Sequence, residues 1–188
     1  MGNNAMNVSA GKPKITGAVF RAPLGTQLPT DATSQLDPAF VGLGYVSDTG
    51  LSNANEMDVS AIKAWGGAIV YRSLTELTDN FKLVLIESKN TDVLKAVYGD
   101  SNVTVAADGD THVEVKAEDP VEAVWVVDMT LRGGIAKRIV IADGAITSRD
   151  EIVYNDSDPI GYGITLSAYP DANGKTHDEY LEGTTISG

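Results

Sequence analysis

The strongest alternation of apolar and polar residues runs from Val121 to Tyr154. Every second residue from 121 to 131 is apolar, a period typical of a strand with one buried face. Two glycine-containing pairs, Gly133-Gly134 and Asp143-Gly144, interrupt the run. Both pairs suit two-residue turns, which require φ > 0 and match the twist of paired strands. We therefore predict three consecutive strands joined by two tight turns.

A two-residue turn at Gly133-Gly134 also fixes the predicted register. Val127 then lies opposite Val140 on an apolar face, while Asp128 lies opposite Ile139 on a mixed face. The predicted core residues of this run are Trp125, Val127, Met129 and Val140.

The rest of the chain predicts further strands and one helix. Asn90 or Thr91 can cap a helix that ends at Tyr98, since Gly99 supplies a stop signal. Short alternating runs recur on both sides of this helix, at 40–47, 59–65, 68–72, 75–87, 103–106, 111–115, 161–169 and 176–181. With about nine or ten antiparallel strands and no βαβ unit, the pattern predicts a mainly β fold. We expect a β-sandwich or open barrel with one short flanking helix and extended terminal arms.

The domain organisation follows from where periodicity is lost. Residues 1–38 are rich in Asn, Ser, Gly, Thr and Pro and predict an extended N-terminal arm. Residues 39–182 then form a single domain that includes the helix at 90–98, and residues 183–188 form a tail. The polar stretch 48–58 predicts a loop, either a mobile one or a contact arm. Its candidate contact residues are Gly50, Leu51, Ser52, Asn53, Asn55 and Glu56.

The composition and net charge of the chain disfavour or exclude several classes of function. The 188 residues carry a formal net charge of −12, which disfavours a general nucleic-acid binder because such binding requires cations against phosphate. There is no cysteine, so disulfides, thiolate metal sites and a cysteine nucleophile are excluded. We expect no signal peptide and no membrane helix, because no long apolar run is present.

Candidate chemistry is sparse. His112 and His177 lie in separate predicted strands without a local partner pattern, which favours structural roles. The pairs Asp108/Asp110 and Asp156/Asp158 resemble fragments of a calcium loop, but neither continues to the terminal Glu, and turn chemistry explains both. We therefore expect no catalytic residue, no cofactor and no metal, and we expect that the protein is not an enzyme.

Several motifs, in order and spacing, resemble those of the major tail protein, or tail tube protein, of long-tailed (siphovirus-type) bacteriophages. The resemblance covers about residues 16–181. Its motifs are APLGTQLPTDA (22–32), GLGYVSDTG (42–50), IKAWGG (62–67), LIESKN (85–90), VLKAVYG (93–99) and GYGITLSAYPD (161–171).

The resemblance implies a structural virion protein whose hexameric rings stack into a tube for DNA passage, bridged by arms and a long loop. It also implies tail partners: a tape measure protein, a tail terminator and baseplate or tail tip proteins. DNA would pass without specific binding, and the protein would be located in the virion tail after assembly in the host cytoplasm. Glu122, Asp128 and Asp150 are the candidate lumen-facing acids, because they lie on mixed faces of long strands; the alternative is that they face outer solvent.

A monomeric immunoglobulin-like binding or adhesion module is the alternative function, since the same strand pattern and low aromatic content fit it. It predicts no polymer. Direct observation of rings or tubes would separate the two.

Overall fold

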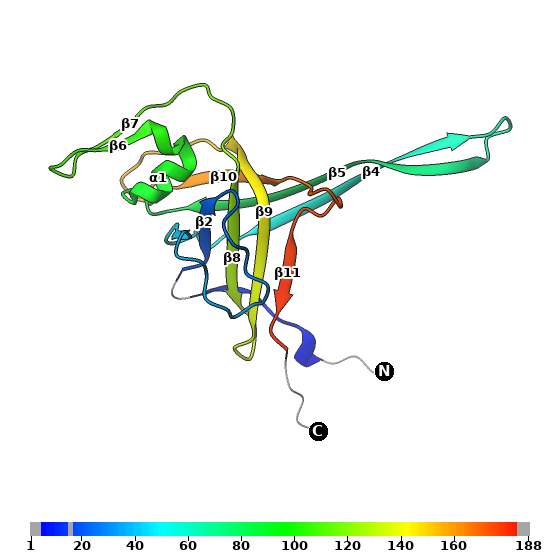
Figure 1. Ribbon diagram of the computed structural model, residues 1–188, viewed down its shortest axis with the longest axis horizontal. Helices are drawn as coiled ribbons and strands as arrows, with labels where there is room; N and C mark the ends of the chain where they lie inside the picture. Colours follow the sequence, from blue (N-terminus) through cyan, green and yellow to red (C-terminus); the bar gives the residue numbers. More distant parts are fainter. Residues whose placement is uncertain (1–4, 15–16, 184–188) are drawn as a thin grey trace.

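One large antiparallel sheet dominates the computed structural model, which describes residues 5–14 and 17–183 (Figure 1). Its strands lie in the order β3–β2–β8–β9–β10–β5–β4, with β1 beside β8 and β11 beside β9. Their bounds are β1 Lys12–Pro13, β2 Val19–Pro23, β3 Val41–Gly42, β4 Ser52–Lys63, β5 Ile69–Leu85, β8 Ala123–Thr130, β9 Ala136–Arg149, β10 Tyr162–Ala168 and β11 Asp178–Leu181. This confirms the mainly β fold.

The sheet curves until its two ends meet through segment 41–47. At one end of the segment, β3 pairs with β2, and the Leu43 N–H donates to the Val19 carbonyl at 2.9 Å. At the other end, Val46 forms a bridge with Leu85 of β5. The segment therefore closes the sheet around a core, as expected of the predicted barrel.

The interior of this barrel is filled by alternate residues of its strands. Trp125 and Val127 of β8 pack there with Ile139 and Ile141 of β9. The Trp125 indole N–H is satisfied by the Gly144 carbonyl at 2.9 Å, which lets the large ring be buried without an unpaired donor. Met129 packs against this cluster while partly buried.

The opposite face of β8 and β9 is also buried. Val126 pairs with Val140, and both lie there with less than 2% of their surface exposed. Arg138, on the same face, donates to the carbonyls of Asp31 (3.1 Å) and Ser34 (2.9 Å). Segment 24–38, called the strap below, therefore crosses and covers this face (Figure 1). Val140 is buried as predicted, but under the strap rather than beside Trp125.

The expected arm at 1–38 is thus partly built into the domain. β2 lies within the sheet, paired with β8 on one side and β3 on the other, and Val19 is buried. The low periodicity around β2 hid it, because the strand is only five residues long. The tail at 183–188 falls outside the described residues except for Gly183.

The run from Val121 to Tyr154 contains one turn, not two. Leu131 pairs with Ile135 around a three-residue loop, in which Gly133 and Gly134 have φ of 84° and 82°. This shifts the register by one residue from the prediction, so Asp128 lies opposite Arg138. A one-residue shift exchanges the two faces of a strand.

Asp143-Gly144 is not a turn, since β9 runs straight through it. Glycine is required at 144 because a Cβ there would meet the Ser167 carbonyl oxygen at 3.1 Å and Ile141 at 3.0 Å. The second predicted turn is therefore wrong: the glycine serves close packing of strands.

The helix is as predicted. α1 (Thr91–Tyr98) is capped by the Asn90 side chain, which accepts from the Asp92 N–H at 3.0 Å, and ends at Gly99. Its buried residues Val93, Leu94 and Val97 pack on the barrel core. The short helices η1 (Ala5–Asn7) and η2 (Asp100–Asn102) and a small sheet of β6 (Val103–Val105) and β7 (Thr111–Val113) complete the fold.

Candidate assembly surface

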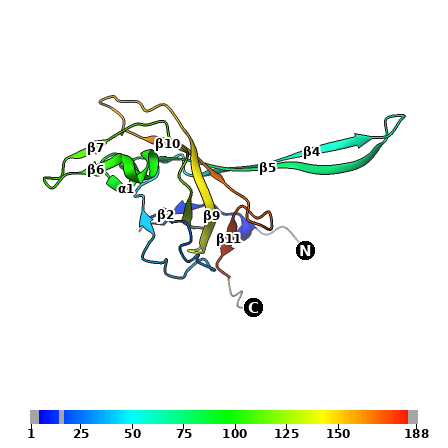
Figure 2. The same cartoon turned by 45° about the horizontal axis from the view of Figure 1, so that its top comes forward.

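A long hairpin of β4 and β5 projects far beyond the barrel (Figures 1 and 2). Its strands are paired from Ser52 opposite Lys82 to Lys63 opposite Ile69, and its turn lies at Ala64–Ala68. The seventeen residues of β5 span about 58 Å at roughly 3.4 Å per residue. The predicted loop at 48–58 is therefore largely strand: Ser52, Asn53, Asn55 and Glu56 belong to the base of the hairpin, while Gly50 and Leu51 precede it.

The distal half of the hairpin, residues 59–74, is apolar and basic. Trp65 at the turn is fully exposed, and most of its neighbours expose large side chains as well. Lys63 and Arg72 are the charged residues of this half, in a chain with net charge −12. The exposed apolar residues are Val59, Ile62, Trp65, Ile69, Val70, Tyr71 and Leu74. Exposed apolar patches of this kind mark interaction sites, so this half of the hairpin is a candidate contact surface.

The base of the hairpin is fixed by a buried carboxylate. Asp79 of β5 is 2% exposed and accepts hydrogen bonds from the Asn53 amide (2.7 Å) and the Thr176 hydroxyl (2.6 Å). His177 Nδ1 lies 2.6 Å from the same carboxylate, and the His177 ring stands edge-on to Phe81. Burial raises the pKa of Asp79, but these hydrogen bonds outweigh it, and the pKa lies below the usual carboxyl value. The segment before β11 is thus joined to both strands of the hairpin.

Four strands share a polar face on the outside of the barrel. The C-terminal half of β9 is followed in the sheet by β10, β5 and β4. On β5 and β10, alternate residues such as Phe81, Leu83 and Leu166 enter the core, so the residues between them face outward. The outward set comprises Ser52, Ala54, Glu56 and Asp58 on β4, Glu76, Thr78, Asn80 and Lys82 on β5, Thr165 and Ser167 on β10, and Thr147 and Ser148 on β9. We call it the polar face.

Hydroxyl and amide groups are joined across this face. The Ser167 hydroxyl donates to Asn80 Oδ1 at 2.6 Å and lies 2.7 Å from the Thr147 hydroxyl. Toward the hairpin the face becomes acidic, with Asp58 directly opposite Glu76 and Glu56 one pair closer to the barrel. Like charges directly opposite each other destabilise a strand pair, so their presence here points to a role other than stability.

Both edges of this four-stranded sheet are open in the described part of the chain. β4 pairs with β5 on one side only, and its twelve residues are all exposed. β8 pairs with β9 only as far as Gly144, so residues 145–149 of β9 have no strand on that side. An unpaired edge is a template for another strand. Because β9, β10, β5 and β4 alternate in direction, the two open edges run antiparallel to each other.

The structure separates the three acids predicted to face a lumen. Asp128 is buried, and its two oxygens accept from Arg138 Nε (2.6 Å) and Nη2 (2.9 Å), so it does not face a solvent-filled lumen. Asp150 is exposed and lies over Gly163, where a Cβ would meet Asp150 Oδ2 at 2.5 Å. Gly163 alternates with Thr165, which places Asp150 at the end of the polar face.

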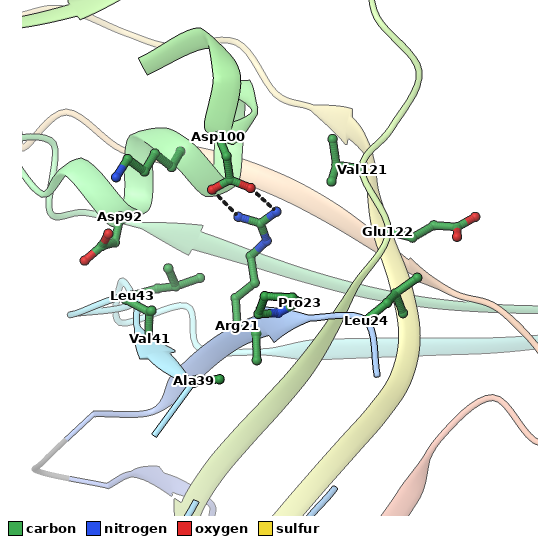
Figure 3. Close-up of a pocket in the computed structure, with 12 residues that line it drawn as sticks. Arg21, Pro23, Leu24, Ala39, Val41, Leu43, Asp92, Asp100, Val121 and Glu122 are labelled. Atoms are coloured by element: carbon green, nitrogen blue, oxygen red, sulfur yellow. Dashed lines mark hydrogen bonds and ion pairs between the residues drawn. The ribbon is translucent and has the colours of Figure 1, made fainter. Parts of the chain in front are cut away.

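Glu122 lies elsewhere, on the rim of a pocket between β2, β3 and α1 (Figure 3). The pocket has a volume of about 350 Å³ and contains a two-point ion pair from Arg21 to Asp100, at 3.1 and 2.9 Å. Leu24 and Val121 line one side and Val41 the other, and all three are exposed. The Glu122 carboxylate points away from the ion pair.

The remaining sequence candidates take structural places. The Asp110 N–H donates to Asp108 Oδ1, and Asn155 accepts from two N–H groups of residues 157 and 158, so both acidic turns are Asx turns. Among the described residues, no group of three or more His, Cys, Asp or Glu side chains is placed to hold a metal. No described helix has the length and apolar character of a membrane span.

The sequence pattern does not predict the extended hairpin, because the polar residues at its base favour a loop. A signal was present: 59–65 and 68–72 were predicted strands on either side of Gly66-Gly67. Joining them across that turn would have given the hairpin.

Two comparisons with known proteins complete the description. A family model described as "Phage tail tube protein" matches residues 1–185, a range that contains every helix and strand described above. No curated protein matches the chain.

Proposed function

Because this chain belongs to the phage tail tube protein family, we propose that it is a ring-forming subunit whose hexamers stack into the tail tube, the conduit for DNA. The observation that carries the proposal is the four-stranded sheet with a polar face and two open edges.

Ring closure is supported by the directions of these edges. If β4 of one subunit pairs with the open edge of β9 in the next, each subunit uses two different surfaces. Such a head-to-tail contact closes into a ring when the rotation permits. Addition of a strand to an exposed edge also satisfies backbone groups that would otherwise be an aggregation hazard. Four strands per subunit keep the continued sheet antiparallel throughout.

The polar face would form the lumen wall. Glu56, Asp58, Glu76 and Asp150 then project toward passing DNA. Carboxylates repel phosphates and offer no release of counterions, which is the main source of non-specific binding. DNA would therefore slide without being retained.

The distal hairpin would bridge successive rings, in place of the loop predicted at 48–58. Its apolar surface and length suit insertion into an adjacent ring rather than exposure to water. We further propose a tape measure protein, a tail terminator and baseplate or tail tip proteins as its tail partners. Assembly in the host cytoplasm, followed by residence in the virion tail, completes the proposal.

The test is negative-stain microscopy of concentrated protein with a matched pair of edge variants. The Asp150 N–H donates to Gly163, so by alternation the backbone N–H of Arg149 faces the open edge. Arg149→Pro removes that donor, whereas Arg149→Ala loses the same side chain but keeps it. We expect rings or tubes from the parent and Arg149→Ala, and monomers of similar Tm from Arg149→Pro.

Tubes formed equally well by Arg149→Pro would show that closure does not use β9. Monomers from the parent at every concentration and salt condition would contradict the proposed function.

The lumen assignment has its own test. Asp58→Lys combined with Glu76→Lys reverses charge on the polar face, and tubes of this variant should retain short duplex DNA in a salt-dependent manner. The control is Glu151→Lys with Asp156→Lys, two exposed acids outside that face. Equal DNA retention by both variants would place the polar face outside the lumen.

A further inference from the structure

The fully exposed Trp65 at the hairpin turn needs a socket that its own subunit does not provide. Trp is the residue most often found as an anchor of protein interfaces, where it fills a pocket on the partner. The pairing of β4 with β5 holds the turn far from the barrel (Figure 1). The pocket that receives Trp65 must therefore lie on another molecule.

The pocket between β2, β3 and α1 has the matching chemistry. Its wall exposes Leu24, Val41 and Val121, large apolar side chains that the subunit leaves uncovered (Figure 3). Its volume of about 350 Å³ falls within the range of sites that hold a single large group. Beside it, the outer edge of β3 has no strand partner in the described part of the chain.

Charge favours the same pairing. Asp92 and Glu122 lie on the pocket rim, and neither makes an ion pair with any described residue. Lys95 offsets them in part, while Arg21 is already neutralised by Asp100. The distal hairpin brings Lys63 and Arg72 and no acid. A basic, apolar tip thus meets an apolar pocket with free carboxylates, the complementarity that steers and orients association.

Two other hollows fit less well. The cleft beside the open edge of β9 is lined mainly by polar and charged groups, including Lys116 and Arg149. The hollow at Pro13 and Tyr45 carries both Lys14 and Glu87, so it offers a basic tip no net negative charge.

We propose that the pocket between β2, β3 and α1 is the socket for the hairpin tip of a second copy of this chain, with Trp65 as the anchor. The assignment rests on the proposed function, since it requires copies to assemble. Asp92 and Glu122 then face Lys63 and Arg72, and the pocket's apolar wall packs on the indole.

The absence of cysteine makes the contact testable by disulfide capture. Ala64→Cys places a thiol beside Trp65, and Val121→Cys places one on the pocket wall. Mixed and assembled, the two single variants should give a disulfide-linked heterodimer on mild oxidation. Trp65→Ala in the Ala64→Cys chain should reduce its yield several-fold. The control partner is Val153→Cys, which is equally exposed but lies away from the pocket.

The outcomes separate the two proposals. Tubes that link Ala64→Cys to Val121→Cys, and not to Val153→Cys, support the socket. Tubes that give no such link, or link both partners equally, overturn the socket but leave the tube function intact. Protein that forms neither rings nor tubes overturns both.

Discussion

The buried ion pair between Arg138 and Asp128 gives the sharpest stability prediction. Arg138 is 1% exposed and uses three nitrogens: Nε and Nη2 for Asp128, and Nη1 for the strap carbonyls of Asp31 and Ser34. Arg138→Met would leave the Asp128 carboxylate buried and two carbonyls without their donor. Removing one partner of a buried pair costs about 3–5 kcal/mol.

The structure sets where in that range the cost should fall. Lys14 Nζ lies 3.6 Å from Asp128 Oδ2 and is half exposed, so it can compensate in part. The lost strap hydrogen bonds add about 1 kcal/mol each. We therefore expect a loss of about 4 kcal/mol, which for a domain of this size lowers Tm by roughly 10 °C.

The assay is urea unfolding of a double-mutant cycle. Asp128→Leu alone should cost as much as Arg138→Met, because it leaves a buried guanidinium unpaired. The double variant should lie only about 2 kcal/mol below the parent, since apolar replacement of a whole buried pair is often nearly neutral and the lost strap hydrogen bonds remain. A single-variant loss below about 1 kcal/mol, or a double variant as unstable as the sum of the singles, would refute this reasoning.

Three further predictions concern other parts of the chain. The pKa of Asp79 is lowered on folding. The stabilisation of the fold by the ionised Asp79 carboxylate is therefore complete above the usual carboxyl pKa of 3.8 and is lost as pH falls through the lower folded value. Asp79→Asn should therefore reduce the pH dependence of unfolding, followed by circular dichroism below pH 4. Gly44→Ala should destabilise the protein by about 2–3 kcal/mol in urea unfolding, because Gly44 has φ +68° and a Cβ at this position would collide with the Glu87 carboxyl. The control is Gly66→Ala, which also has positive φ but lies in open space and should cost about 1 kcal/mol. Trp65→Ala should leave Tm unchanged but slow tube growth measured by light scattering; a Tm shift of several degrees would contradict its free exposure.

Alternation and capping signals predicted much of the fold because they are local. The sequence predicts a helix at 90–98 capped by Asn90 or Thr91, and the structure has it at Thr91–Tyr98 with Asn90 as the cap. The strands around Asp108-Gly109 and the strand β10 also form where the sequence predicts them. These elements depend on residues a few positions apart.

The errors came from interactions between residues distant in sequence. Gly144 leaves room for Ser167, which is 23 positions later in the sequence. The local pair Asp143-Gly144 is nevertheless typical of a turn, so the sequence predicts one there. The single extra residue in the loop after Leu131 shifts β9 by one position against β8, so that Arg138 and Val140 lie on the face of Asp128. Because the predicted register places Asp128 opposite Ile139, the buried pair of Asp128 with Arg138 and its hold on the strap could not be predicted.

The candidate surface was only partly predictable for the same reason. Asp150 was chosen from its place on a mixed strand, and it lies at the polar face. Glu56 was named, but as a loop contact rather than as a carboxylate of a sheet. The opposition of Asp58 to Glu76 exists only once the hairpin register is known.

The continuity of β5 gives the tip of the hairpin a mechanical connection to the interior of the subunit. One unbroken strand runs from Ile69, beside the turn, to Leu85 in the core, and its inner part pairs with β10 from Asp79 to Leu85. A pull along the hairpin therefore loads that ladder in shear, with its hydrogen bonds perpendicular to the force and strained together rather than one after another. A tube held by such hairpins would resist stretching at every ring while bending at the turns between them.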